Sequence, residues 1–142
     1  MTEDERDRIE RACLKIVVDC AHAADNFRHD EFVSLFTKDG ALILPRGEYR
    51  GHKAIAEMLA GRDRKQMTCH VVTNTKITVL DGTNASGVVY LTLYKGNPAA
   101  GEAVVYDTVP EAVGCYEDRY VKTAEGWRFA ERRSKRLFVK KQ

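Results

Sequence analysis

The chain has 142 residues, of which 44% are hydrophobic and 31% are charged, and its formal net charge is +2. This length suits one core, so we expect a single domain over residues 1–142, with the apolar content of a folded chain. The small net charge excludes a global field that would attract nucleic acid or a membrane surface. No apolar run approaches the roughly 20 residues that span a bilayer, and the first residues are charged, so a cytoplasmic protein is predicted.

The chain contains four cysteines, and none of them has the C-x-x-C spacing of zinc sites and redox motifs: Cys13, Cys20, Cys69 and Cys115. In a reducing compartment the default state of a cysteine is a buried free thiol. The sequence therefore predicts neither a disulfide nor a metal site.

A long helix is predicted at the start of the chain. Thr2 and Glu5 fit a capping box, which marks a helix N-terminus. Apolar residues then recur at helical spacing, at Ile9, Cys13, Ile16, Val17, Cys20 and Ala24. This spacing predicts a helix that runs to about Ala24 with one buried face.

Two further helices are predicted before residue 62. The pattern of residues 29–36 indicates a short helix, which Asp39-Gly40 stops. A short strand over 41–45 and a turn over 45–51 follow. Residues 52–61 have the pattern of a third helix that ends at a glycine.

The second half of the chain is typical of long antiparallel strands. β-Branched and aromatic residues form four runs, near residues 68–80, 85–95, 112–123 and 127–138. Asp81-Gly82 and Glu125-Gly126 are hairpin signals, whereas residues 95–110 form a longer loop.

Helices followed by a meander of strands predict an α+β fold, because parallel strands would need helices between them. We expect three N-terminal helices packed in the concavity of a strongly curved, mostly antiparallel sheet, a cone-like α+β barrel. One long helix does not fill such a cone, and the remaining interior space is where small ligands bind. The uncovered face of the sheet predicts a homodimer or higher homo-oligomer.

Asp25 follows the apolar stripe of the first helix, at a position that still points inward. A carboxylate there needs a partner. One interpretation is that Asp25 caps the second helix through backbone N–H groups. The other is that it meets a titratable partner in the interior.

His70 begins the first long strand, and it shares a strand face with Val72 and Asn74. A lone histidine is more often structural than catalytic. A histidine held by a carboxylate, however, has a fixed tautomer and a stabilised imidazolium, as a general base requires. The pair of Asp25 and His70 is therefore a stronger signal than either residue.

Arg132 lies in the last strand within a run of cations. Most charges of such a run, including Arg133, are expected to face solvent. Side chains alternate along a strand, so if Arg132 points inward then Arg133 points outward. An inward guanidinium would stabilise a developing anion, because it stays charged when desolvated.

Several motifs carry a family resemblance over nearly the whole chain: AADNFRHDEFVSLFTKDGAL, EYRG, HVVTN and YEDRYVKTAEGWRFAERR. Together they resemble the SnoaL-like branch of the nuclear transport factor 2-like superfamily. The resemblance is to members of the scytalone dehydratase and hexachlorocyclohexane dehydrochlorinase type. It implies an Asp–His dyad that abstracts a proton and an arginine that assists a departing anion, without a cofactor.

By motif, the catalytic residues implied by the resemblance fall on Asp25, His70 and Arg132. Tyr49 and Tyr116 fall on pocket positions, and Asn74 shares the face of His70. The chain departs from these members at Cys20, where the dehydrochlorinase has a lysine, and at Ala24, where the dehydratase has a tyrosine. Neither substrate is therefore carried over.

The leading hypothesis is a lyase or isomerase of the dehydratase type, which uses acid/base chemistry on a small, largely apolar ring compound. The second is a non-catalytic module of the same fold that binds a small ligand or mediates dimerisation. The third, nucleic-acid binding by the basic C-terminal tail, is disfavoured because acidic residues of the first helix offset the tail's charge.

Overall fold

The computed structural model describes residues 1–141 and has an α+β architecture. Three helices come first: α1 (Glu3–Asp25), α2 (His29–Ser34) and α3 (Gly51–Ala60). The strands are β1 (Phe36–Leu44), β2 (Gly47–Arg50), β3 (Met67–Val79), β4 (Asn84–Gly96), β5 (Ala112–Thr123) and β6 (Gly126–Val139). In this part of the chain, no helix is long and apolar enough to cross a membrane.

The six strands form one curved, mixed sheet in the order β2-β1-β6-β5-β4-β3. The pairs from β3 to β6 are antiparallel, as predicted, whereas β1 runs parallel to β6. The sheet stays open, because β2 and β3 are its two edges. The predicted cone is therefore an open, strongly curved sheet, not a closed barrel.

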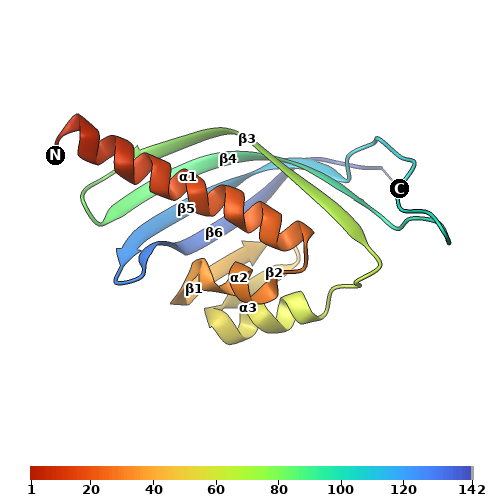
Figure 1. Ribbon diagram of the computed structural model, residues 1–142. Helices are drawn as coiled ribbons and strands as arrows, with labels where there is room; N and C mark the ends of the chain where they lie inside the picture. Colours follow the sequence, from red (N-terminus) through yellow and green to blue (C-terminus); the bar gives the residue numbers. More distant parts are fainter. Residues whose placement is uncertain (142) are drawn as a thin grey trace.

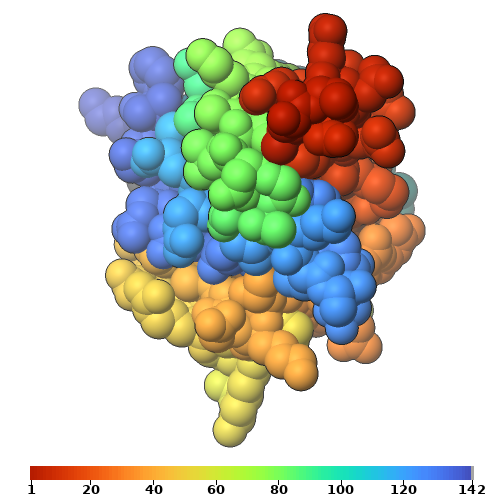
Figure 2. Space-filling model, turned by 90° about the vertical axis from the view of Figure 1, so that its left-hand side faces the viewer, coloured from red at the N-terminus to blue at the C-terminus, as the bar shows by residue number. Residues whose placement is uncertain are grey.

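Helix α1 lies along the concave face of the sheet, and α2 and α3 lie beside β1 and β2 (Figure 1). The predicted capping box is confirmed: the Thr2 hydroxyl accepts from the Glu5 N–H at 3.1 Å, and the Thr2 N–H donates to Glu5 Oε2 at 3.3 Å. All six apolar positions predicted for this helix are buried. The N-terminal turns of α1 lie beside the β3–β4 and β5–β6 hairpins at one end of the molecule (Figure 2).

The core lies between α1 and the sheet. Phe36, Tyr120 and Phe129 form its aromatic centre, with ring centroids 5.0 Å and 5.5 Å apart for the two contacts of Phe129. Cys13 and Cys20 are buried in this core as predicted, but Cys69 is exposed on the outer face of β3 and Cys115 is half-buried. All four are free thiols.

The segment between α2 and α3 differs from the prediction. Helix α2 ends at Ser34, and Phe36 already belongs to β1, which continues through Asp39-Gly40 instead of stopping there. The pairing of β1 with β6 shifts between Phe36 and Ala41. A Cβ at Gly40 would lie 3.0 Å from the carbonyl oxygen of Phe129, so this glycine allows the irregularity instead of ending an element. Residues 47–50, predicted as part of a turn, pair with β1 as β2.

Candidate functional site

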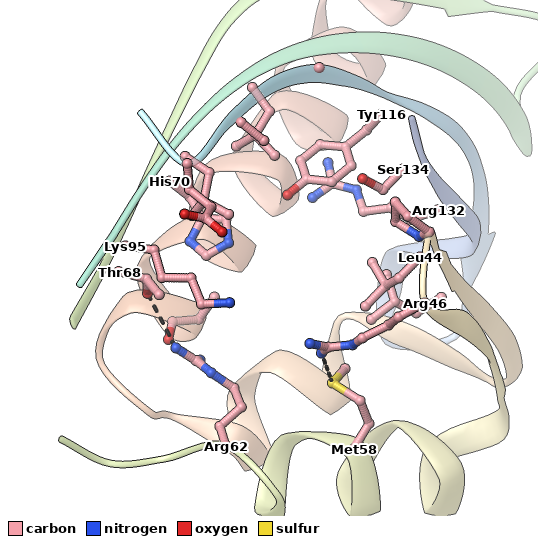
Figure 3. A pocket seen from close by; sticks show the side chains of 18 of the residues that line it. Leu44, Arg46, Met58, Arg62, Thr68, His70, Lys95, Tyr116, Arg132 and Ser134 are labelled. Carbon is pink, nitrogen blue, oxygen red and sulfur yellow. Dashed lines mark hydrogen bonds between the residues drawn. The ribbon is translucent and has the colours of Figure 1, made fainter. Parts of the chain in front are cut away.

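A cavity of about 550 Å³ opens between the C-terminal half of α1, α3 and the concave face of the sheet. This volume lies within the roughly 300–1,000 Å³ range of small-molecule sites. Its wall includes apolar side chains from α1, α2, β1, β4 and β5: Cys20, Ala24, Phe32, Leu42, Leu91 and Tyr116. Figure 3 shows polar side chains projecting into this space from several elements.

Asp25, the last residue of α1, makes its hydrogen bonds to β3. Its carboxylate accepts from the Thr68 hydroxyl at 2.9 Å and from the backbone N–H of His70 at 3.0 Å. Its Oδ1 atom lies 2.6 Å from Nδ1 of His70. The N-cap of α2 is Arg28, whose side chain makes no capping bond. The interpretation of Asp25 as a helix cap is therefore wrong, and the carboxylate bridges α1 to β3.

These contacts set the ionisation of Asp25. Burial raises the pKa of this carboxyl, but hydrogen bonds from the imidazole and backbone N–H of His70, and from the Thr68 hydroxyl, lower it below its ordinary value. An ionised carboxylate can only accept hydrogen bonds, so Nδ1 of His70 carries a proton. Nε2 is then the free position of the ring.

His70 lines the cavity directly, with 18% of its side chain exposed, whereas Asp25 is not one of the residues of the cavity wall. Within residues 1–141, Nε2 of His70 has no hydrogen-bond partner. When the ring is neutral, this arrangement places the free Nε2 atom at the cavity wall and the carboxylate at Nδ1. This geometry can accept a proton from a bound molecule and stabilise the resulting imidazolium.

Arg132 is buried and lines the cavity, and its neighbour Arg133 is exposed, as strand alternation predicts. The guanidinium forms a bidentate pair with Asp118, with Nε to Oδ1 at 2.8 Å and Nη2 to Oδ2 at 2.9 Å. The Cζ atom of this guanidinium lies 3.8 Å from the ring centroid of Tyr116. Burial lowers the pKa of Arg132, but the charge and hydrogen bonds of Asp118 raise it above the ordinary value, so the group stays charged.

Asp118 was not predicted from the sequence, although a signal for it exists. It pairs across the sheet with Arg132 and shares an inward face with Tyr116 and Tyr120. The hydroxyl of Tyr120 donates to Asp118 Oδ2 at 2.8 Å. A carboxylate between two tyrosines at period two, opposite an inward arginine, indicates a buried ion pair.

The three predicted binding residues lie in different places. Tyr116 is 8% exposed and lines the cavity, and Tyr49 of β2 lines it as well. Asn74 is exposed and is not part of the cavity wall. The pairing of β3 with β4 shifts between Thr73 and Lys76, and Asn74 adopts φ 49°, so a bulge ends the alternation that begins at His70. The prediction that Asn74 shares the inward face of His70 is therefore wrong.

Three cations that sequence reasoning did not single out also line the cavity: Arg46, Arg62 and Lys95. They come from the turn after β1, the turn after α3, and β4. No motif marks them, because the fold brings them together from separate segments. Within residues 1–141, no three His, Cys, Asp or Glu side chains are placed to hold a metal ion.

Comparison with solved structures places the fold among known proteins. The structure is similar to that of a putative scytalone dehydratase from Novosphingobium aromaticivorans, with a TM-score of 0.81 and 19% identity over 98% of this chain and 91% of that one. A hexachlorocyclohexane dehydrochlorinase, type 2, gives a TM-score of 0.82 and 13% identity over 98% and 92%. A protein of unknown function from Mycobacterium tuberculosis gives 0.81 and 22% over 98% and 78%.

At these identities the structural likenesses establish the fold alone. No curated protein matches the sequence. The sequence does match the SnoaL-like domain over residues 6–133, which is most of its length. The chain therefore belongs to the SnoaL-like family.

Proposed function

We propose that the protein is an acid/base enzyme, a lyase or isomerase of the dehydratase type, which acts on a small ring compound in the cavity. The observation that carries the proposal is the 2.6 Å contact of Asp25 with Nδ1 of His70 at the wall of a cavity of about 550 Å³. The names of two structural neighbours, a putative scytalone dehydratase and a dehydrochlorinase, are those of eliminating enzymes and support a reaction that begins with proton removal.

His70 is the proposed general base. Nε2 removes a proton from the substrate, while Asp25 holds Nδ1 in its protonated form and stabilises the imidazolium. Such a base contributes about two to four powers of ten in rate, and positioning by the cavity wall supplies much of the rest. For an isomerase, the same imidazolium returns the proton at another atom; for a lyase, it protonates the leaving group.

Tyr116 and Arg132 are proposed to stabilise the anion that develops. Figure 3 shows the hydroxyl of Tyr116 facing the cavity, with Arg132 against its ring. Burial raises the pKa of Tyr116, so the hydroxyl stays protonated and can donate a hydrogen bond. Arg132 forms an ion pair with Asp118 and lies against the ring of Tyr116. Its proposed contribution to stabilising the anion is the positive potential that it places behind this ring. Tyr49 completes the wall on the side of β2.

The test is proton removal in D₂O by the intact protein and by H70Q. A panel of cyclic ketones and cyclic β-hydroxyketones is followed by NMR for deuterium incorporation and by absorbance for elimination. We expect exchange or elimination on at least one ring compound, and a loss of about two to four powers of ten in H70Q. H22Q is the matched control, since His22 is exposed on α1 and outside the cavity.

Equal rates in H70Q and in the intact protein would contradict the proposed base. Binding of panel compounds without exchange or elimination would favour the alternative function, a small-ligand-binding module. The protein is further proposed to act as a homodimer through the outer face of the sheet, and the Discussion gives the test.

A further inference from the structure

Within residues 1–141, four cations of the cavity wall have no carboxylate partner: Arg46, Arg62, Lys95 and Arg136. Arg136 belongs to β6, and the other three are labelled in Figure 3. In Figure 3 the amine of Lys95 and the guanidinium of Arg46 point into the cavity from opposite walls, and Arg62 lies at its lower edge. Arg46 and Lys95 are exposed, so they mark the entrance, whereas Arg62 is half-buried. Within residues 1–141, none of the three forms an ion pair.

Neutral acceptors hold the guanidinium of Arg62 in place. Nη1 donates to the carbonyl oxygen of Ala24 at 2.7 Å, Nη2 donates to the Thr68 hydroxyl at 3.2 Å, and the group lies 4.6 Å from the ring centroid of Phe27. Burial lowers the pKa of Arg62, and Arg46 lowers it further, although Asp25 raises it. A positioned guanidinium that has lost water and has no bonded carboxylate is ready to bind an anion.

The three cations Arg46, Arg62 and Lys95 share the wall with other charged groups, but they form no ion pair with them. Arg132 and Lys135 pair with Asp118 and Glu117, and Asp63 accepts the backbone N–H of Lys65. Three carboxylates line the cavity without pairing with Arg46, Arg62 or Lys95: Glu57, Asp63 and Glu111. Among the residues that the structure describes, the one polar contact of the Arg46 side chain is to the sulfur of Met58 at 3.1 Å, a weak acceptor that leaves most of the guanidinium donors free.

The position of Arg62 relates the cations to the proposed base. The Thr68 hydroxyl accepts from Arg62 and donates to Asp25, which in turn contacts His70. Thr68 and His70 are two residues apart on one face of β3, which separates their Cα atoms by about 7 Å. An anionic group held by Arg62 would therefore lie about one ring's width from His70.

We propose that the ligand of this cavity is a ring compound that carries a carboxylate, bound by Arg46, Arg62 and Lys95 at the entrance, with its ring between His70 and Tyr116. The inference rests on the proposed function, whose substrate class it names: an organic acid, not a purely apolar ring. Guanidinium groups fit a carboxylate through two parallel hydrogen bonds, and Lys95 adds a mobile positive charge. The apolar wall then accommodates the ring.

The experiment compares matched pairs of ligands without turnover. Benzoate, 2-naphthoate and cyclohexanecarboxylate are each titrated against their primary amides by calorimetry and ligand-observed NMR. We expect the best carboxylate to bind at least about tenfold tighter than its amide, and this preference to weaken as salt rises. In R46Q, R62Q and K95Q the carboxylate should lose about five- to tenfold in affinity, while the amide changes little.

K53Q and R133Q are the controls, because they remove an exposed cation outside the cavity and change the net charge equally. The proposal is overturned if no carboxylate binds at about 10 mM, if carboxylates bind no tighter than their amides, or if the controls lose as much affinity as the cavity variants.

H70Q separates this inference from the proposed function. If H70Q keeps the carboxylate preference, the anion site stands whether or not His70 is a base. If H70Q abolishes the preference and the three cation variants retain it, an imidazolium binds the anion and the proposed site is wrong.

Discussion

Asp118 and Arg132 form an ion pair with 0% and 3% of their side chains exposed. Removing two charges from water costs several kcal/mol for each ion, and the bidentate geometry offsets that cost only while both partners are present. The pair also holds Arg132 against the ring of Tyr116 at the cavity wall. A substitution at either residue therefore acts on stability as well as on the cavity.

We expect R132M to lower the free energy of unfolding by about 3–5 kcal/mol, because it leaves Asp118 charged and unpaired in the core. The double variant D118L/R132M should regain most of that loss, since neither charge then remains. R133M should change stability by less than about 0.5 kcal/mol, because Arg133 is exposed and its pair with Glu131 spans 3.8 Å. Urea unfolding measures all three, and additive losses in the double variant would contradict the coupling.

At the scale of elements, the end of α1 is attached to β3 through one carboxylate. Asp25 accepts hydrogen bonds from the Thr68 hydroxyl and from the backbone and ring of His70. These bonds hold the pKa of Asp25 below its ordinary value of 3.8. The folded state therefore binds the proton of Asp25 less readily than the unfolded chain does.

The stability that Asp25 contributes is fully present above the unfolded pKa of about 4, and it is lost as pH falls through the lower folded value. We expect D25N to lower the free energy of unfolding at pH 7, and to lose less stability between pH 5 and about pH 2.5 than the intact protein loses. D19N is the control, because Asp19 lies earlier in the same helix and forms an exposed pair with Lys15. If the free energy of unfolding falls equally with decreasing pH in D25N and in the intact protein, Asp25 does not have this role.

At the scale of the whole molecule, α1 covers one face of the sheet and leaves the other uncovered (Figure 1). Apolar side chains on that outer face of β3 and β4 are exposed: Val71, Val88 and Tyr90. Exposed apolar side chains on the adjacent strands β3 and β4 are typical of an interface between protein chains.

We expect a homodimer of about 32 kDa, twice the 16.0 kDa of one chain, symmetric about a two-fold axis. Y90E should shift sedimentation equilibrium at micromolar concentrations towards the monomer, because it places a charge in the centre of the interface. V18K should not, since Val18 is exposed to a similar degree on α1, away from the outer face of the sheet. A monomer in the intact protein, or equal effects of the two variants, would contradict this assembly.

The sequence by itself determined the local elements and the inward positions on the longest of them. The apolar stripe of α1 and the β-branched runs of β3 to β6 are periodic over many residues, so they specify both the element and its buried face. The pairing of Asp25 with His70 was a hypothesis from their positions at the end of one such segment and the start of another. Arg132 was assigned by the family resemblance, and strand alternation predicted only that Arg132 and Arg133 face opposite sides. The α+β order followed from the sequence of these elements along the chain.

Only the tertiary structure decided the features that depend on pairing between distant segments. The parallel pairing of β1 with β6 joins residues about 90 apart, and no local period specifies it. The bulge after Thr73 turns Asn74 away from the cavity, because one shifted residue reverses every later side chain of a strand. Arg46, Arg62 and Lys95 lie in separate segments, and only the curvature of the sheet brings their charges to one entrance beside His70.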